Sequence, residues 1–124
     1  MHWLSIALGG ALGAMARYGL GIWVTNLVDH RMPLGTLIVN IVGSFAIGLV
    51  YVGIVDKALL PPEWRMFVIT GFLGAFTTFS TFSLDALHLW QDGQIYLALG
   101  YVLLSVMCSL VAVGIAVSLA HKVF

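Results

Sequence analysis

Four long apolar stretches, separated by short polar segments, account for almost the whole chain of 124 residues. They cover about residues 3–28, 34–55, 64–90 and 95–122. A bilayer core about 30 Å thick is crossed by a helix of about 20 predominantly apolar residues. The pattern therefore predicts one integral membrane domain over residues 1–124, an all-α membrane protein with four transmembrane helices and short loops.

The third apolar stretch is rich in small and hydroxyl-bearing residues between positions 71 and 83. Glycine exposes the backbone, and threonine offers it a competing hydrogen bond, so Gly74 followed by Thr77 and Thr78 disfavours a regular helix. Irregular backbone at membrane depth is tolerated only where protein or a water-filled cavity surrounds it. We therefore expect a break in the third helix, of the kind found at ion-binding sites in transporters.

The first stretch carries a cation in its middle. Gly9, Gly13, Arg17 and Gly21 recur every four residues, so they share one face of a helix, and the glycines allow another helix to come close. A cation within a span costs roughly 2.5–3.5 kcal/mol on insertion scales. Arg17 therefore either fastens the fold by bonding helix-end carbonyls or attracts anions, and the sequence leaves both roles open.

The second and fourth stretches each present a polar face. Asn40 lies in a stripe of small and polar residues, and its amide has both donors and an acceptor. From the sequence alone we favour a hydrogen bond between helices over a donor to a passing anion. In the fourth stretch Tyr101, Ser105, Cys108 and Ala112 share a face. We interpret it as a packing face, which becomes a pore wall only if it meets the phenylalanines of the third stretch.

Composition excludes several classes of protein. The chain is 61% hydrophobic and 8% charged, whereas a soluble domain carries about 25% charged residues. Its net charge is zero, so we expect no basic surface for nucleic acid. The four histidines lie near the predicted water interfaces, and no Cys/His spacing suggests a metal centre. We therefore expect no enzyme.

The predicted break offers chemistry for ions of both signs. The first half-helix ends with carbonyls that lack internal partners, and this end of its dipole is negative, so carbonyls near Gly74 and Thr77 suit a hard cation such as sodium. Phe79 and Phe82 share a face if the helix resumes. The positive edges of their rings can replace part of the water shell of a small anion. Because four short helices are few to enclose a pore, we expect a symmetric oligomer.

Three motifs in this order resemble the CrcB/Fluc fluoride channel family over essentially the whole chain. They are Gly10-x-x-Gly13-x-x-x-Arg17-Tyr18, Gly35-Thr36-Leu-x-x-Asn40-x-x-Gly43-Ser44 and Gly71-x-x-Gly74-x-x-Thr77-Thr78-Phe79-Ser80-Thr81-Phe82-Ser83. The third motif is long and highly specific, whereas the other two would be weak alone.

The resemblance implies an antiparallel, dual-topology homodimer with two fluoride pores and one central sodium ion. By motif position it assigns a fluoride path to Phe79, Phe82, Asn40, Tyr101, Thr81, Ser105 and Thr36. It places Arg17 in a vestibule and gives the sodium ion the backbone carbonyls of Gly74 and Thr77. Asp85 sits near the exit of the third stretch, where many members have glutamate, and its role stays open.

Our hypothesis is a fluoride-selective channel in a prokaryotic inner membrane that gives passive fluoride export and hence fluoride resistance. One alternative is a small four-span, proton-coupled multidrug exporter, which needs a titratable carboxylate inside the membrane. The other is a non-transporting membrane assembly subunit, whose polar stripes serve only to hold helices together.

Overall fold

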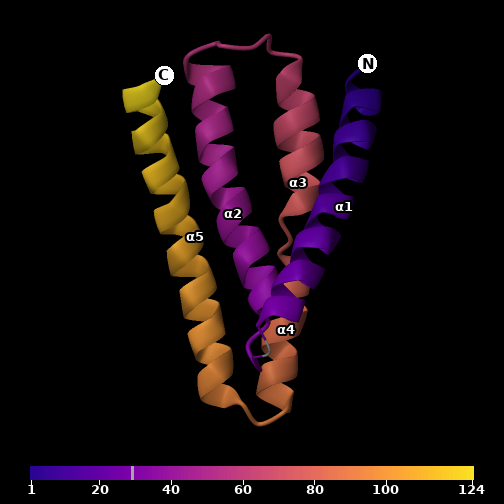
Figure 1. Ribbon diagram of the computed structural model, residues 1–124, viewed down its shortest axis with the longest axis vertical. Coiled ribbons are helices and arrows are strands. Elements are labelled where there is room, and N and C mark those ends of the chain that lie inside the picture. The colour runs from indigo at the N-terminus through magenta and orange to yellow at the C-terminus, as the bar shows by residue number, and fades with distance from the viewer. Residues whose placement is uncertain (29) are drawn as a thin grey trace.

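The computed structural model describes residues 1–28 and 30–124, and no strand occurs in that part of the chain (Figure 1). The fold class expected from the sequence, all-α, is therefore confirmed. In chain order the elements are α1 (His2–Leu27), α2 (Leu34–Tyr51), the π-helical segments η1 (Val52–Asp56) and η2 (Met66–Leu73), α3 (Gly74–Phe76), α4 (Ser80–Gln91) and α5 (Ile95–Val123).

The helices form a bundle in which the chain runs repeatedly from one end to the other (Figure 1). Both termini and the connection between η1 and η2 lie at one end, and the turn from α4 to α5 lies at the opposite end. That turn contains Gly93, whose φ of 81° falls in the left-handed region that favours glycine. At the first end His121 approaches Asp56 to 3.6 Å, although both side chains are substantially exposed.

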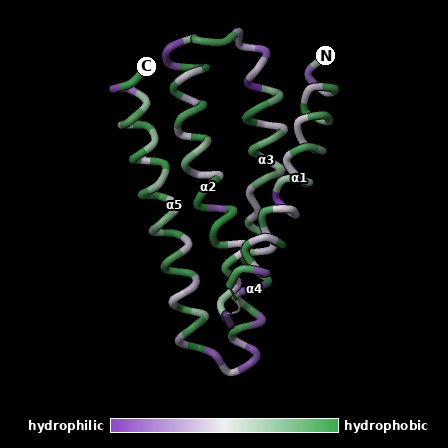
Figure 2. The backbone as a smooth tube through the Cα atoms, in the orientation of Figure 1, coloured by the Kyte–Doolittle hydropathy of each residue, from purple (hydrophilic) through white to green (hydrophobic). Residues whose placement is uncertain are grey.

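Three helical segments of the described residues are long and apolar enough to cross a membrane: Leu34–Asp56, Met66–Gln91 and Ile95–Val123. Apolar residues run along the helices, whereas hydrophilic residues gather at the two ends of the bundle (Figure 2). The protein is therefore a multi-pass membrane protein. Helix α1 is also 26 residues long, but Arg17 and its glycines make it less apolar than these three segments.

Glycines on α1 allow that helix to lie against η2 at very short range. Cβ atoms added at Gly9 and Gly13 would overlap the carbonyl oxygens of Phe67 and Phe72, respectively. On the facing segment, a Cβ at Gly71 would lie 2.9 Å from the Ile6 oxygen. Small residues that let backbones approach in this way are the usual basis of close helix packing in membranes. The expected glycine face of the first stretch is thus an interface with the third helix.

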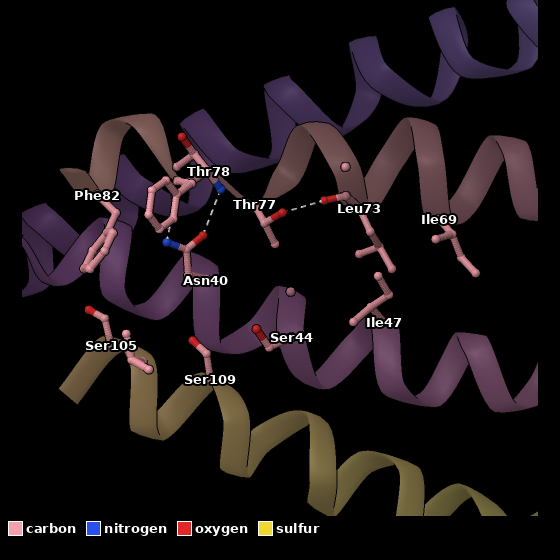
Figure 3. A pocket seen from close by; sticks show the side chains of 14 residues that line it. Asn40, Ser44, Ile47, Ile69, Leu73, Thr77, Thr78, Phe82, Ser105 and Ser109 are labelled. Carbon is pink, nitrogen blue, oxygen red and sulfur yellow. Dashed lines mark hydrogen bonds between the residues drawn. The ribbon is translucent and has the colours of Figure 1, made fainter. Parts of the chain in front are cut away.

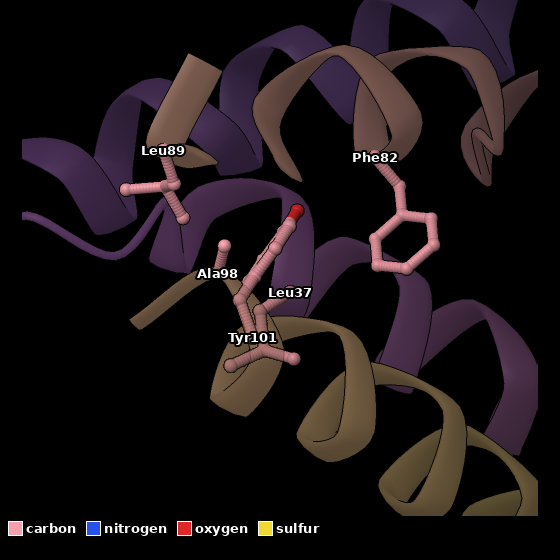
Figure 4. Close-up of a cluster of buried hydrophobic side chains, with 5 residues drawn as sticks. All are labelled: Leu37, Phe82, Leu89, Ala98 and Tyr101. Carbon is pink, nitrogen blue, oxygen red and sulfur yellow. The ribbon is translucent and has the colours of Figure 1, made fainter. Parts of the chain in front are cut away.

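A buried cluster fixes α4 against α2 and α5. It consists of Leu37, Phe82, Leu89, Ala98 and Tyr101, which come together near the end of the bundle that holds α4 (Figure 4). Tyr101 has no exposed surface at all, and the other members are less than one-tenth exposed. The half-helix after the break is therefore held by its own apolar contacts as well as by the chain that leads into it.

The third helix is interrupted, as the sequence predicts. Helix α3 ends at Phe76, and α4 begins at Ser80, so residues 77–79 have no helical structure. Thr77 is extended, with φ −85° and ψ 158°. The chain is π-helical over Met66–Leu73, directly before α3, and this form is rare and frequently marks functional sites.

We predict that Gly13→Ala destabilises the fold, because the added methyl group must push the Phe72 carbonyl and hence η2 away from α1. Overpacking of this kind typically costs about 1–3 kcal/mol. Thermal unfolding in detergent would measure the loss. Gly19→Ala is the matched control, because nothing lies within 4 Å of the position of its added Cβ. Equal unfolding temperatures for the two variants would contradict the close approach of α1 and η2.

Candidate functional site

The break leaves backbone groups that a continuous helix would pair internally. With residues 77–79 outside any helix, the carbonyls at the end of α3 lose their amide partners, and the amides at the start of α4 lose their carbonyls. In lipid each unsatisfied group costs several kcal/mol, so the protein has to supply partners from elsewhere. The site is built largely by the side chains that do this.

Asn40 supplies both partners for Thr78. Its Nδ2 donates to the Thr78 carbonyl at 2.9 Å, and its Oδ1 accepts from the Thr78 backbone N–H at 2.9 Å (Figure 3). A primary amide can replace a peptide group in this way because it carries donor and acceptor side by side. The interhelical bond that the sequence favoured for Asn40 is therefore present, and it is made to the broken segment.

Arg17 binds another freed carbonyl. Its Nε donates to the oxygen of Ala75, at the end of α3, over 3.1 Å. This places a cation near the negative end of the first half-helix. Of the two roles left open for Arg17, fastening a helix-end carbonyl is thus observed. Among the described residues no carboxylate pairs with Arg17 within 4 Å, so its charge is not neutralised by a partner of opposite sign.

The hydroxyls of Thr77 and Thr78 form hydrogen bonds at the two helix ends that flank the break. Thr77 Oγ1 donates to the Leu73 carbonyl at 3.0 Å, so it bonds back to its own turn (Figure 3). Thr78 Oγ1 accepts from the N–H of Thr81 at 3.2 Å, which is the geometry of an N-cap, and it also lies 3.2 Å from Thr81 Oγ1. Thr78 therefore anchors the start of α4, a role that the sequence analysis did not assign to it.

The carbonyls of Gly74 and Thr77 keep no such partner. Within residues 1–28 and 30–124, neither the Gly74 oxygen nor the Thr77 oxygen accepts a hydrogen bond at the break. Both residues line an open groove of about 380 Å³ between the third helix, α2 and α5. Freed carbonyls beside an accessible groove are the kind of donor set that binds a hard cation.

The same groove collects aromatic rings and hydroxyls, and we call it the Asn40 groove. Phe79 and Phe82 line it with ring centroids 5.6 Å apart and planes tilted by 54°. The two rings differ in burial, because Phe79 is 77% exposed, whereas Phe82 is 8% exposed. The polar side chains that line it are Asn40, Ser44, Thr77, Thr78, Ser105 and Ser109.

Ser105 is the buried hydroxyl of this groove. It is 5% exposed, and in the described part of the chain its Oγ has no hydrogen-bond partner. The hydroxyls of Ser105 and Ser109, one turn apart on α5, both point toward α2 and the break (Figure 3). A buried hydroxyl without a partner is uncommon and calls for an explanation such as a bound ion or water.

A second cavity of about 380 Å³ lies on the other side of the break, and we call it the Arg17 cavity. It is lined by charged, hydroxyl and aromatic residues from α1, α2 and α4, among them Arg17, Tyr18, Thr25, Thr36, Thr81 and Asp85. Thr78 lines both the Asn40 groove and the Arg17 cavity. The broken segment is therefore the wall between them.

Tyr101 and Asp85 form a hydrogen-bonded pair beside this wall. The Tyr101 hydroxyl donates to Asp85 Oδ2 at 3.3 Å, and the Tyr101 ring lies 5.3 Å from the ring of Phe82. Tyr101 lies behind Phe82 and is not part of the lining of either cavity. Asp85, for which the sequence suggested no partner, is partly buried within α4.

Apart from Tyr101, which lines neither cavity, the candidate residues divide into two sets. Those that line the Asn40 groove are Asn40, Gly74, Thr77, Phe79, Phe82 and Ser105. Those that line the Arg17 cavity are Arg17, Thr36 and Thr81. Sequence reasoning missed the roles of Ser109 and Thr78, although Ser109 lies four residues after Ser105 and so on the same helical face. On α5, Cys108 and Ala112 line a separate apolar groove with Phe45, away from the phenylalanine pair.

Comparison with known proteins agrees with the motifs. A family model described as "CrcB-like protein, Camphor Resistance (CrcB)" matches residues 4–117. A protein of Saccharophagus degradans named "Fluoride-specific ion channel FluC" is 52% identical, over 97% of this chain and 90% of that protein. Proteins of the same name from Hahella chejuensis and Syntrophotalea carbinolica are 46% and 43% identical, each over 98% of this chain and over 96% and 99% of their own lengths. The family resemblance is therefore confirmed, and the chain belongs to the CrcB-like family.

Proposed function

We propose that this protein is a fluoride-selective ion channel that lets fluoride leave the cell passively through the inner membrane. The observation that carries the proposal is the interrupted third helix, which brings the phenylalanine pair, the Asn40 amide and the hydroxyls of α5 to one groove. The relatives named fluoride-specific ion channels match along nearly their whole length, which supports the same activity here. A channel of this kind requires no catalytic group.

The route of the anion follows from the two cavities. The Arg17 cavity is lined by the Arg17 guanidinium and by the Asp85 carboxylate, and these two groups form no ion pair within 4 Å in the described residues. The unpaired guanidinium would attract an anion into the cavity. Thr36 and Thr81 provide hydroxyl donors along that cavity. Beyond Thr78, the Asn40 groove offers Ser105 and the ring edges of Phe79 and Phe82. Hydroxyl donors and positive ring edges can together replace the water that fluoride sheds.

A second copy of the chain completes the site in this proposal. Phe79 is 77% exposed beside polar groups, and the Asn40 groove is open along one side. Two chains in antiparallel orientation would place two broken helices at a two-fold axis and cover both grooves. Such a homodimer has one groove per protomer and hence two fluoride paths.

The freed carbonyls of Gly74 and Thr77 would hold a structural sodium ion at the centre of this dimer. Hard cations take oxygen ligands, and the two chains together provide four such carbonyls. Bound there, the ion supplies positive charge that balances the half-helix dipoles and stabilises anions nearby. Thr77 is oriented for this task by its own hydroxyl, which is bonded to Leu73, and by the methyl group that rests against Gly43.

We predict that Phe82→Ile strongly reduces fluoride efflux from proteoliposomes, because isoleucine lacks the positive ring edge. One lost contact of this kind corresponds to roughly a two- to ten-fold change, if it is similar to the about 0.5–1.5 kcal/mol that aromatic pairs contribute. Efflux is followed with a fluoride electrode after addition of a potassium ionophore. Leu84→Ile is the matched control, because Leu84 is exposed on α4 outside the groove. Unchanged fluoride release from Phe82→Ile, or chloride release as fast as fluoride release, would refute the proposed path.

Asn40→Ala should weaken both the fold and conduction, because it leaves the Thr78 N–H and carbonyl without partners. Each unsatisfied buried group costs about 1–3 kcal/mol. Asn40→Asp should also reduce efflux, since aspartate can accept from the N–H but cannot donate to the carbonyl. Thermal unfolding and efflux are measured together, with Gln91→Ala at the exposed end of α4 as control. Wild-type behaviour of both Asn40 variants would show that the pairing with Thr78 is dispensable.

Gly43→Ala should weaken the response to sodium, because the added Cβ would overlap Thr77 Cγ2 and lie 3.2 Å from the ring of Phe76. Thr77 must then move, and its carbonyl moves with it. A bound ion stabilises the folded protein by RT ln(1 + [Na⁺]/Kd), so the unfolding temperature is recorded as sodium replaces N-methylglucamine. At the same sodium concentration, the rise in unfolding temperature should be smaller in Gly43→Ala and unchanged in Gly114→Ala, where nothing lies within 4 Å. Absence of any sodium effect in the unaltered protein would remove the cation from the proposal.

A further inference from the structure

Tyr101 is the most completely buried aromatic side chain of the described residues, and it contacts one lining residue of each cavity. Its ring packs against Phe82, which lines the Asn40 groove, at 5.3 Å and with the planes tilted by 44°. Its hydroxyl reaches Asp85, which lines the Arg17 cavity. Figure 4 shows the hydroxyl turned away from Ala98 toward the side of α4. One side chain on α5 thus connects residues of both cavities.

The hydroxyl of Tyr101 has one proton, and in the structure Asp85 accepts it at 3.3 Å. Because Tyr101 is fully buried, water cannot readily take over as the acceptor if the carboxylate is removed, and the Thr36 hydroxyl is the other side chain within its reach. A buried donor without a partner is costly, so the ring would shift to find one. Any such shift moves the surface against which Phe82 rests.

We infer that Asp85 is a positioning residue, which holds the Tyr101 hydroxyl so that the Tyr101 ring keeps Phe82 in place beside the anion route. This inference rests on the proposed fluoride conduction and assigns Asp85 a role within it. Asp85 acts as a hydrogen-bond acceptor through Tyr101, so its negative charge is not what conduction requires. Charged and titratable groups around it are Tyr101 from α5 and Arg17 and Tyr18 from α1, together with His88 on its own helix.

The test compares variants that differ in acceptor and in charge. Asp85→Ala removes the acceptor and should lower fluoride efflux from proteoliposomes by about two- to ten-fold, the range that one hydrogen bond provides. Asp85→Asn and Asp85→Glu both keep an acceptor oxygen and should retain efflux close to that of the unaltered protein. Tyr101→Phe removes the donor and should reproduce the loss. Asp92→Ala, in the turn after α4, is the control with a lost carboxylate and normal efflux.

The double variant Asp85→Ala with Tyr101→Phe separates this role from a general weakening of the fold. Its efflux should equal that of either single variant, because both remove the same interaction. Losses that multiply would overturn the inference, as would normal efflux in Asp85→Ala. A loss in Asp85→Asn as large as in Asp85→Ala would show that charge, not hydrogen bonding, is required.

Two further measurements keep the outcomes distinct. Gel filtration and thermal unfolding are measured for each variant. If Asp85→Ala does not fold, Tyr101→Phe alone must show the loss of fluoride efflux. Adding Asp85→Asn to Tyr101→Phe must then cause no further loss. Failure of either condition overturns the inference. If neither the unaltered protein nor Asp92→Ala releases fluoride, the proposed function itself fails. If both release fluoride and Asp85→Ala does so equally, only the role of Asp85 is refuted.

Discussion

The structure depends on the pairing of one side-chain amide with one peptide group inside the bundle. A helix that stops at Phe76 and resumes at Ser80 releases polar backbone groups where no bulk water can bind them. Asn40 pairs with both backbone groups of Thr78 at 2.9 Å, and Arg17 takes the carbonyl of Ala75. Without these partners a continuous helix would be the favoured state of this segment. Every feature of the candidate site follows from the fact that the break is held open.

The side chains at these positions supply the hydrogen-bond partners that the backbone loses at the break. A peptide group offers a donor and an acceptor in one plane, and asparagine is the shortest side chain that matches both. Arginine carries several donors in a rigid fork, so Nε can bond Ala75 while Arg17 also lines the Arg17 cavity. The two interpretations of Arg17, fastening the fold and attracting anions, therefore do not compete. The insertion cost of the cation is offset in part by the carbonyl that it satisfies.

The helices and the break could be predicted from the sequence, because both depend on residues that are close together along the chain. Apolar runs of more than 20 residues require helices in lipid, and Gly74, Thr77 and Thr78 weaken a helix whatever surrounds them. The partners could not be foretold, since Asn40 and Thr78 are 38 residues apart and Arg17 and Ala75 are 58 apart. Only tertiary packing brings such pairs together. The same holds for Tyr101 and Asp85, and for the π-helical turns η1 and η2, which no residue pattern in the chain indicates.

Hydrogen bonds to the broken backbone explain how one chain folds. They do not explain the polar groups that have no hydrogen-bond partner. The Gly74 and Thr77 carbonyls, the Ser105 hydroxyl and the exposed ring of Phe79 all border the same open groove. If the groove served only to pack against lipid, the two carbonyls and the hydroxyl would each carry a desolvation penalty with no compensation. A cation bound by the carbonyls and an anion passing the hydroxyl and the ring edges would remove those penalties together. The proposed function accounts for both kinds of group, because it makes the unpaired ones ligands for ions and the paired ones the frame that holds them in place.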